Sequence, residues 1–231
     1  MNILQNYLEH RYKQEQEEVL EPGPVITISR DYGCSGKYLA DKLAYRLQQE
    51  GRGEEKKGKW RVISKEVLEH SAKELELDPS QIEYVFKYEK KSAVDEILRA
   101  VSSKYYKSDR KIKNTIKKVI YNFGENGNTI ILGRGGTAIT HDIDKAVHVR
   151  LIAPIDWRTE VIKKRFKLTN TKKTRDYILD IDKKRAELRN EMAGGVTVDD
   201  THYDILFNAS KLSYNQMVQI VMEIMEMRKL I

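Results

Sequence analysis

A chain of 231 residues, 40% of them apolar, is long enough to bury one sizeable core, or a core plus one smaller lobe. It has no run of about 18 apolar residues and its first 20 residues are charged throughout, so we expect neither a membrane-spanning helix nor a signal peptide. The net charge of +7 favours anionic ligands, and the single cysteine, Cys34, excludes an internal disulfide and suits the reducing cytoplasm.

Residues 1–24 are predicted to be an extension ahead of the main domain. Apolar side chains recur at helical spacing from Ile3 to Tyr12, and the proline-containing segment 21–24 would end that helix. No residue pattern in the extension indicates chemistry. We therefore expect it to dock on the core or on a second subunit, so that the protein is a monomer or a homodimer.

From residue 25 onward, short apolar and β-branched runs alternate with helical patterns. Five strands are predicted, at residues 25–29, 60–64, 129–133, 146–153 and 203–208. Helices are predicted in between, with a capping pattern at Asp78, Pro79 and Gln81 and a second N-cap at Asp156. Such alternation indicates a parallel sheet with helices on both faces, which binds ligands beyond the carboxyl ends of its strands.

The segment DYGCSGKY, which begins at Asp31, connects the first strand to a helix and is a candidate phosphate-binding loop. Against the pattern G-x-x-x-x-G-K-[ST], Gly36 and Lys37 match, but Asp31 replaces the first glycine and Tyr38 replaces the metal-binding hydroxyl residue. Gly33 and Gly36 would still let the backbone curl with its N–H groups inward, beside the positive end of a helix. The alternative is an ordinary turn with a surface lysine, and the loop alone favours neither.

More charged residues follow at positions where a phosphotransferase would use them. Arg134 lies in ILGRGG, just past the third strand, and would be at the mouth of the site. Arg158 and Arg165 are seven residues apart and so share a helix face, and Asp182 and Arg185 share another at i, i+3. Taken alone, each feature is better explained without function: Arg134 by an exposed turn, Arg158 and Arg165 by a solvated basic helix, and Asp182 with Arg185 by a weak surface ion pair.

Taken in order, these residues resemble the cytidylate kinase-like family of P-loop nucleoside monophosphate (NMP) kinases, above all its divergent branch, whose opening reads like ITISREYGSGG. The resemblance runs from Val25 to the C-terminus, and GRGG, APIDWR, DKKR and YDILFN support it. It implies a three-layer P-loop NTPase fold with a five-stranded parallel sheet. It also implies a domain over 25–231 with a helical NMP-binding lobe at about 65–125, which matches only loosely, and a mobile lid at about 166–200.

The resemblance further implies transfer of the γ-phosphate of ATP to CMP or dCMP. The residues that would act in the transfer are Lys37, Arg134, Arg158 and Arg165. Those that would hold ATP are Gly33, Cys34, Ser35, Gly36, Lys37 and Tyr38 around its phosphates, and Asn208 and Ser210 near its adenine. Asp182 and Arg185 match the family motif that contacts the acceptor nucleotide.

Departures from the family pattern leave the acceptor and the turnover open. Cytidylate kinases have Asp where this chain has Gly135, and an additional lid arginine where it has Ile178. Because Tyr38 cannot hold a metal as Ser or Thr does, Mg²⁺ would be held mainly by phosphate oxygens and water, with no metal site on the protein.

Three other functions compete with the NMP kinase. A degenerate kinase could bind a nucleotide without turnover, and a kinase could act on another small molecule. A nucleic-acid binder could use the surplus of Lys and Arg, but no basic motif interleaved with aromatic residues supports it, so we expect no nucleic-acid partner. Cys34 could be redox-active at a helix N-terminus, although a small residue tolerated in a tight loop explains it better.

Overall fold

The computed structural model describes residues 23–50, 59–87 and 108–231. The predicted N-terminal helix therefore lies outside the described residues. The sheet contains β1 (Val25–Arg30), β2 (Arg61–Ile63), β3 (Thr129–Leu132), β4 (Ala146–Ile152) and β5 (Ile205–Asn208). These are the five predicted strands, each within two residues at either end.

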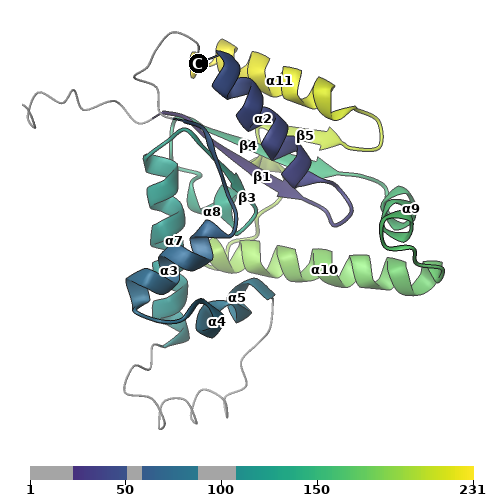
Figure 1. Ribbon diagram of the computed structural model, residues 1–231, viewed down its shortest axis with the longest axis horizontal. Helices are drawn as coiled ribbons and strands as arrows, with labels where there is room; N and C mark the ends of the chain where they lie inside the picture. Colours follow the sequence, from purple (N-terminus) through teal and green to yellow (C-terminus); the bar gives the residue numbers. More distant parts are fainter. Residues whose placement is uncertain (1–22, 51–58, 88–107) are drawn as a thin grey trace, which may run out of the picture.

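All strand pairs are parallel, and the order across the sheet is β2-β3-β1-β4-β5 (Figure 1). β1 is central, and Val25, Ile26 and Ile28 have no exposed surface because both faces of the sheet are covered. A strand buried on both faces reads as a continuous apolar run rather than an alternating one, which is why VITIS could be recognised.

Helices form a layer on each side of the sheet (Figure 1). One layer contains α2 (Gly36–Glu50) and α11 (Tyr214–Met227), whose apolar faces share a buried cluster with β1, β4 and β5. The other contains α3 (Glu66–Leu75), α7 (Asp109–Glu125), α8 (Gly136–Ile139) and α10 (Thr171–Met192), which share a second cluster with β2 and β3. The predicted three-layer α/β fold with a five-stranded parallel sheet is confirmed.

The described part of the predicted NMP-binding lobe is helical. It comprises α3, α4 (Pro79–Ile82), α5 (Tyr84–Lys87) and α7, while residues 88–107 lie outside the described residues. The predicted cap is confirmed: Asp78 accepts from Ser80, Pro79 opens α4, and Gln81 completes a capping box. This cap satisfies N–H groups that have no partner inside the helix.

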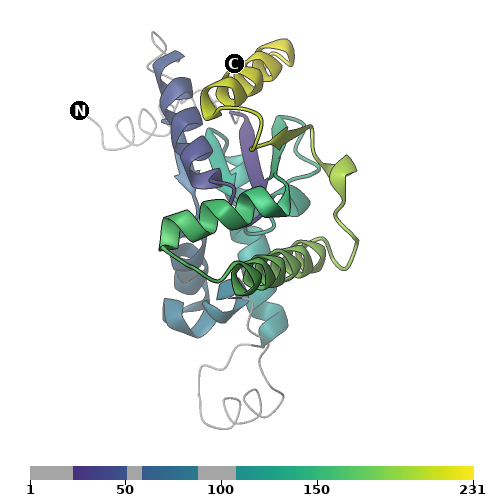
Figure 2. The ribbon, with the colours of Figure 1, turned by 90° about the vertical axis from the view of Figure 1, so that its right-hand side faces the viewer.

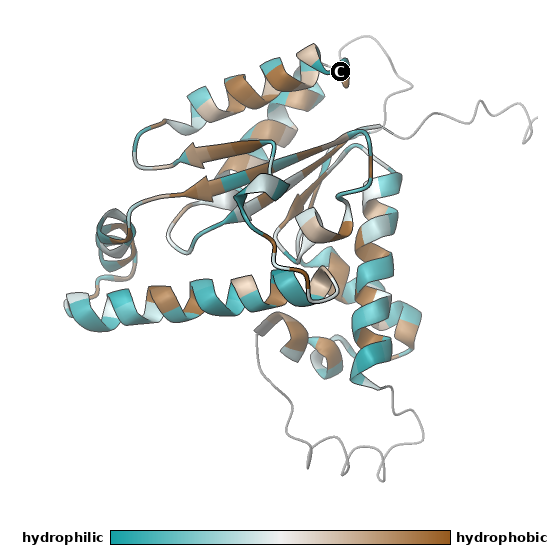
Figure 3. Ribbon diagram, turned by 180° about the vertical axis from the view of Figure 1, so that it is seen from behind, coloured by the Kyte–Doolittle hydropathy of each residue, from teal (hydrophilic) through white to brown (hydrophobic). Residues whose placement is uncertain are grey.

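Two helices pass beyond the carboxyl end of the sheet, α9 (Ile155–Phe166) and α10, and Figure 2 shows them side by side. The predicted cap at Asp156 is wrong: the N-cap is Pro154, whose φ of −53° already suits a helix entry, so α9 begins at Ile155. Asp156 lies in the first turn and forms an ion pair with Arg175 of α10. α10 is largely hydrophilic along its length (Figure 3), and a short 3₁₀ helix, Asp200–His202, follows it.

No helix in the three described ranges is long and apolar enough to cross a membrane.

Candidate active site

The candidate phosphate-binding loop lies at the carboxyl end of β1 and leads into α2. Gly33 has φ of +103°, a conformation that L side chains rarely adopt, and a Cβ there would approach Arg158 Cβ to 3.0 Å. Glycine at this position lets α9 pack directly against the loop. The loop is therefore a tight turn against which α9 packs.

Several N–H groups of the loop already have acceptors from the protein. The Tyr32 N–H donates to Asp182 Oδ1 at 2.7 Å, and the Ser35 N–H donates to the Tyr214 hydroxyl at 3.0 Å. Within the described residues, the N–H groups of Gly33, Lys37 and Tyr38 have no acceptor. The loop thus offers an anion some open donors at the start of α2, and others that would first have to leave their partners.

Lys37 extends into solvent. Its ammonium pairs with Asp41 one helical turn away at 2.8 Å, and its side chain is 75% exposed. Such an exposed i, i+4 pair is worth only a few tenths of a kcal/mol. Lys37 can therefore exchange Asp41 for a phosphate at little cost.

Two arginines of α9 reach the loop in different ways. Arg158 is buried, donates from Nε to Ala153 O at 2.9 Å and from Nη1 to Tyr32 O at 3.1 Å, and forms an ion pair with Asp182. Arg165 is exposed and donates to Ser35 Oγ at 3.0 Å. Arg158 thus fixes the loop against α10, whereas Arg165 has its guanidinium at the surface beside it.

Burial raises the pKa of two ionisable side chains in the loop, Asp31 and Cys34. Burial and the negative charge of Asp182 raise the pKa of Asp31, against the opposing effects of Arg158 and Arg150. Burial, with a smaller effect of Asp31, raises the pKa of the Cys34 thiol to about 12. Since the thiolate is the reactive form, the raised pKa disfavours thiol chemistry at Cys34, which agrees with a small residue tolerated in a tight loop.

Beside the loop lies a second feature, a pocket under the GRGG turn, which we call the arginine pocket. Its cavity volume is about 20 Å³, room for about one water molecule, in a depression that opens to solvent, and its basic lining residues are Arg30, Arg134, Arg185 and Arg189. Hydrogen bonds hold the residues at its floor in place: the Thr27 hydroxyl lies 2.9 Å from the Thr137 hydroxyl and 2.8 Å from His148 Nδ1. Burial lowers the pKa of His148.

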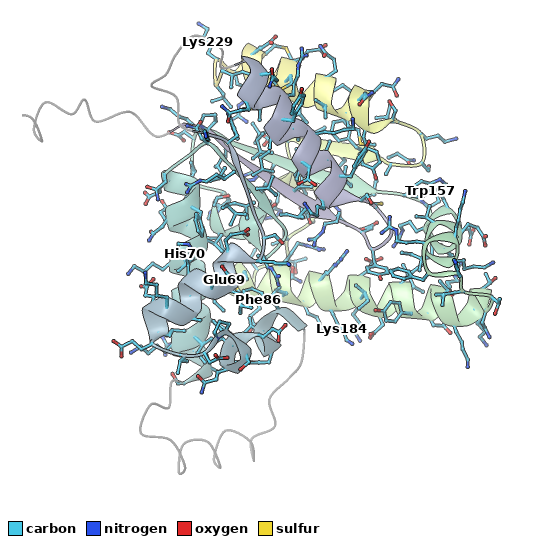
Figure 4. All side chains as sticks on the ribbon, in the orientation of Figure 1. Glu69, His70, Phe86, Trp157, Lys184 and Lys229 are labelled. Carbon is cyan, nitrogen blue, oxygen red and sulfur yellow. The ribbon has the colours of Figure 1, made fainter. Side chains whose placement is uncertain are left out.

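The four arginines come from three parts of the chain. Arg30 ends β1, and its guanidinium crosses Gly133, where an added Cβ would lie 2.0 Å from Nη1. Arg134 stacks on the Phe86 ring, 4.1 Å from its centroid, and donates to Ser64 O at 3.3 Å. Phe86, labelled in Figure 4, lies where α5 approaches α10.

Arg185 and Arg189 both belong to α10 and lie one turn apart. Arg185 donates from Nη1 to Arg30 O at 3.1 Å. The Nε atoms of both arginines are buried and have no hydrogen-bond partner in the described chain. Burial lowers the pKa of the Arg189 guanidinium.

The structure also explains two departures from the family pattern. A Cβ at Gly135 would lie 2.6 Å from Met192 Cγ, so an aspartate there would collide with α10. Ile178, at the position of the additional lid arginine, is fully buried. Neither position can carry the family's charged residue unless α10 moves.

The sequence-predicted residues fall into two groups. Lys37, Arg158, Arg165 and Asp182 meet at the loop, while Arg134 and Arg185 line the arginine pocket. Asn208 and Ser210 bond to each other after β5, with Ser210 Oγ donating to Asn208 Oδ1 at 2.7 Å, and their adenine contact remains a prediction.

Sequence reasoning missed Arg30, Arg189 and Tyr214. Arg189 follows Arg185 by four residues and Asp182 by seven, so helical spacing alone would have placed it on the same face. Arg30 is the arginine of the family's ITISREYGSGG opening, but its contact with Gly133 could not be predicted from the sequence, and nothing in the local pattern marks Tyr214, because these contacts join segments far apart in the chain.

The residues at the loop do not form a magnesium site of their own. No group of three His, Cys, Asp or Glu side chains that could hold a metal occurs in the ranges described. The Tyr38 ring packs edge-on against Tyr214 with centroids 4.9 Å apart, and the Asp182 carboxylate is taken by Arg158 and the Tyr32 amide.

Known structures share this architecture. An uncharacterized protein from Eubacterium ventriosum superposes with a TM-score of 0.61 at 17% identity, covering 88% of this chain and 98% of that one. A shikimate kinase from Bacteroides thetaiotaomicron superposes with a TM-score of 0.50 at 14% identity, with the same coverage. At these identities the likeness concerns the fold alone, which is the predicted P-loop NTPase fold.

Sequence comparison adds a short match and a long one. A uronate isomerase from Corynebacterium glutamicum is 26% identical over 94 residues, which are 41% of this chain and only 18% of that protein's length. The cytidylate kinase-like family matches residues 25–211, most of the chain, as the order of the loop, GRGG and DKKR motifs predicts. The chain belongs to the cytidylate kinase-like family.

Proposed function

We propose that this protein transfers the γ-phosphoryl group of ATP to a nucleoside monophosphate, with CMP and dCMP as the acceptors expected from its family. The observation that carries the proposal is the juxtaposition of two anion sites. The loop with its open N–H groups and Lys37 lies next to the arginine pocket, since Arg30 of the pocket also packs against Gly36 of the loop.

The chemistry needs few covalent steps from the protein. An oxygen of the acceptor phosphate attacks the γ-phosphorus of ATP, the bond from that phosphorus to the β–γ bridging oxygen breaks, and ADP leaves with the electron pair. A phosphate oxygen is already ionised at neutral pH, so no general base is required. What the reaction does require is in-line positioning and positive charge around a spread-out anionic transition state.

The residues of this chain would divide that work. Lys37 and Arg165 flank the loop and would meet the phosphates of ATP, while Arg134 and Arg185 would meet the acceptor. Arginine suits these places because its planar guanidinium binds phosphate oxygens in pairs and stays charged. Arg158, buried against Asp182, would act as a positioning residue for the loop.

The direct test measures ADP formation by the purified protein with ATP, Mg²⁺ and each common nucleoside monophosphate in turn. We expect turnover with at least one cytidine acceptor above the rate of ATP hydrolysis without acceptor. Absence of acceptor-dependent ADP from every nucleotide would refute the proposal.

One observation favours a second candidate, a nucleotide-binding protein without turnover. The Tyr32 and Ser35 amides are occupied by Asp182 and Tyr214, so binding of a polyphosphate competes with internal contacts. Calorimetry that shows ATP binding together with no turnover across a broad panel of acceptors, nucleotides included, would favour this function over the kinase.

A further inference from the structure

We propose that the arginine pocket binds the phosphate group of a phosphate-monoester acceptor and that Arg189 is one of its ligands. The proposal rests on the phosphotransferase function above. It adds Arg189, which lies outside the family motif, to the residues that would meet the acceptor's phosphate.

The position of Arg189 is set by α10. Asp182, Arg185 and Arg189 follow one another at i, i+3 and i+7, so all three lie on the face of the helix that meets β1. The first contacts the phosphate-binding loop, whereas the other two line the pocket. Arg189 therefore faces the same space as Arg185, one turn further along.

Both arginines bring donors that the protein itself does not satisfy. Their Nε atoms are buried and have no partner among the described residues, and the lining of the pocket includes four arginines but no Asp or Glu. A buried charged donor without an acceptor is costly, and like charges brought together add to that cost. The carboxylates of Asp31 and Asp182 already offset part of this cost at Arg189, and an oxyanion seated among the arginines would offset more of it.

Charge and shape favour a phosphate monoester over a carboxylate. A phosphate monoester carries nearly two negative charges and three terminal oxygens, so it can accept from several guanidinium groups that approach from different directions. A carboxylate has one charge and a single plane of lone pairs. Four arginines from β1, the GRGG turn and α10 surround the pocket, which suits the group with more charge and more directions.

The location suits the proposed reaction. The aliphatic part of Arg30 would be 3.2 Å from a Cβ at Gly36, so the pocket and the start of α2 are neighbours. A hydrogen bond between the Thr27 and Thr137 hydroxyls holds the floor of the arginine pocket in place. An acceptor phosphate held there is close to the loop that would carry ATP, and the arginines would offset the repulsion between the two anions.

The test titrates the full-length protein with inorganic phosphate by calorimetry, without ATP, so that it does not depend on turnover. We expect wild-type protein to bind phosphate, acetate not to compete, and Arg189→Met to weaken phosphate binding at least about tenfold. Lys183→Gln, which removes an exposed charge from the same helix, is the matched control and should bind as wild type.

Two outcomes would overturn the proposal: unchanged phosphate binding in Arg189→Met, or binding lost in Lys37→Ala but kept in Arg189→Met, which would put the anion on the loop alone. Arg189→Lys keeps the charge without the guanidinium fork and should bind with intermediate affinity. It carries the test if Arg189→Met does not fold, as judged by circular dichroism, and wild-type binding by it would then count against the proposal.

A kinetic measurement separates this proposal from the function it rests on. With an acceptor that turns over, Arg189→Met should raise KM for the acceptor at least about tenfold and leave KM for ATP within about twofold. Wild-type protein that binds phosphate in the pocket but forms no ADP would refute the kinase and leave the pocket intact. An unchanged acceptor KM in Arg189→Met would refute the role of Arg189 alone.

Discussion

The candidate phosphate-binding loop and the arginine pocket are neighbours that differ in how their hydrogen-bond donors are satisfied. In the loop, donors are matched by the protein: Tyr32 N–H with Asp182, Ser35 N–H with Tyr214, and Lys37 with Asp41. In the pocket, the Nε atoms of Arg185 and Arg189 are left without partners among the described residues. Besides using its open Gly33, Lys37 and Tyr38 N–H groups, a ligand at the loop would have to displace internal contacts, whereas a ligand at the pocket would meet donors that have no partner among the described residues.

The contact expected to matter most for this contrast is the buried pair of Arg158 and Asp182, which fixes the loop against α10. Arg158→Met leaves a half-buried carboxylate unpaired, so we expect the free energy of unfolding to fall by about 3 kcal/mol. For a domain of this size, that corresponds to a fall in Tm of about 6–12 °C by calorimetry.

Arg165→Met, on the same helix but exposed, is the control and should change the free energy of unfolding by less than about 0.5 kcal/mol. Equal destabilisation by the two variants would show that the loop is not held by the buried pair.

The next effect concerns Lys37, the exposed cation of the loop. Lys37→Ala should lower kcat/KM for ATP-dependent transfer at least about 100-fold, because the variant loses a charge that meets the phosphates in the transition state. Its Tm should stay within about 1 °C of wild type, since the pair with Asp41 is exposed.

Lys118→Ala is a matched control for Lys37→Ala. Lys118, in α7, is also exposed, and it pairs at 2.8 Å with Glu74 of α3. The Lys118→Ala variant should be fully active. Wild-type turnover by Lys37→Ala would assign the transition-state charge to the arginines alone.

A smaller effect is expected from Tyr214, which occupies the Ser35 N–H. Tyr214→Phe frees that donor and keeps the ring that packs on Tyr38, so ATP should bind about fivefold more tightly, the value of one neutral hydrogen bond. Tyr45→Phe, at a 70% exposed position, should leave the affinity unchanged. Weaker ATP binding by Tyr214→Phe would mean that the hydroxyl serves the nucleotide instead of competing with it.

The smallest effect concerns the floor of the pocket. Burial lowers the pKa of His148 below its usual 6.5, so the unfolded state binds more protons than the folded state between the two values. The stability contribution is therefore complete above pH 6.5 and is lost as the pH falls through the lowered pKa.

We expect the free energy of unfolding, from urea denaturation, to fall between about pH 7.5 and about pH 5.5 by less than about 1.4 kcal/mol per pH unit. His148→Asn should flatten this slope, and exposed His70→Asn, whose side chain is not among the causes of the His148 shift, should not. A slope that is unchanged in His148→Asn would place the titrating group elsewhere.

Local chemistry explains which parts of the fold could be predicted from the sequence. The central strands are apolar on both faces, and the cap at Asp78 is formed with Ser80 and Gln81, only two and three residues away. Both features can therefore be predicted from a short stretch of sequence. The cap at Asp156 was misplaced because α9 begins at Ile155, after an N-cap proline that makes no side-chain hydrogen bond, and side-chain capping rules do not detect such a start.

The candidate site could be predicted only in part from the sequence, for a different reason. Spacing brought Arg158 and Arg165 to one helix face, but it could not tell that one is buried against Asp182 while the other is exposed. That difference depends on α10, which folds back over β1 from 150 residues further along the chain. The arginine pocket likewise combines three distant segments, and no local pattern could predict it.

One helix, α10, carries Asp182 at the candidate phosphate-binding loop and Arg185 and Arg189 at the arginine pocket. Any tilt or slide of that helix shifts all three side chains together, because a regular helix does not stretch between neighbouring turns. A movement of α10 that releases the Tyr32 amide would therefore also displace the Arg185 and Arg189 guanidinium groups, so the helix would couple the two proposed substrate sites.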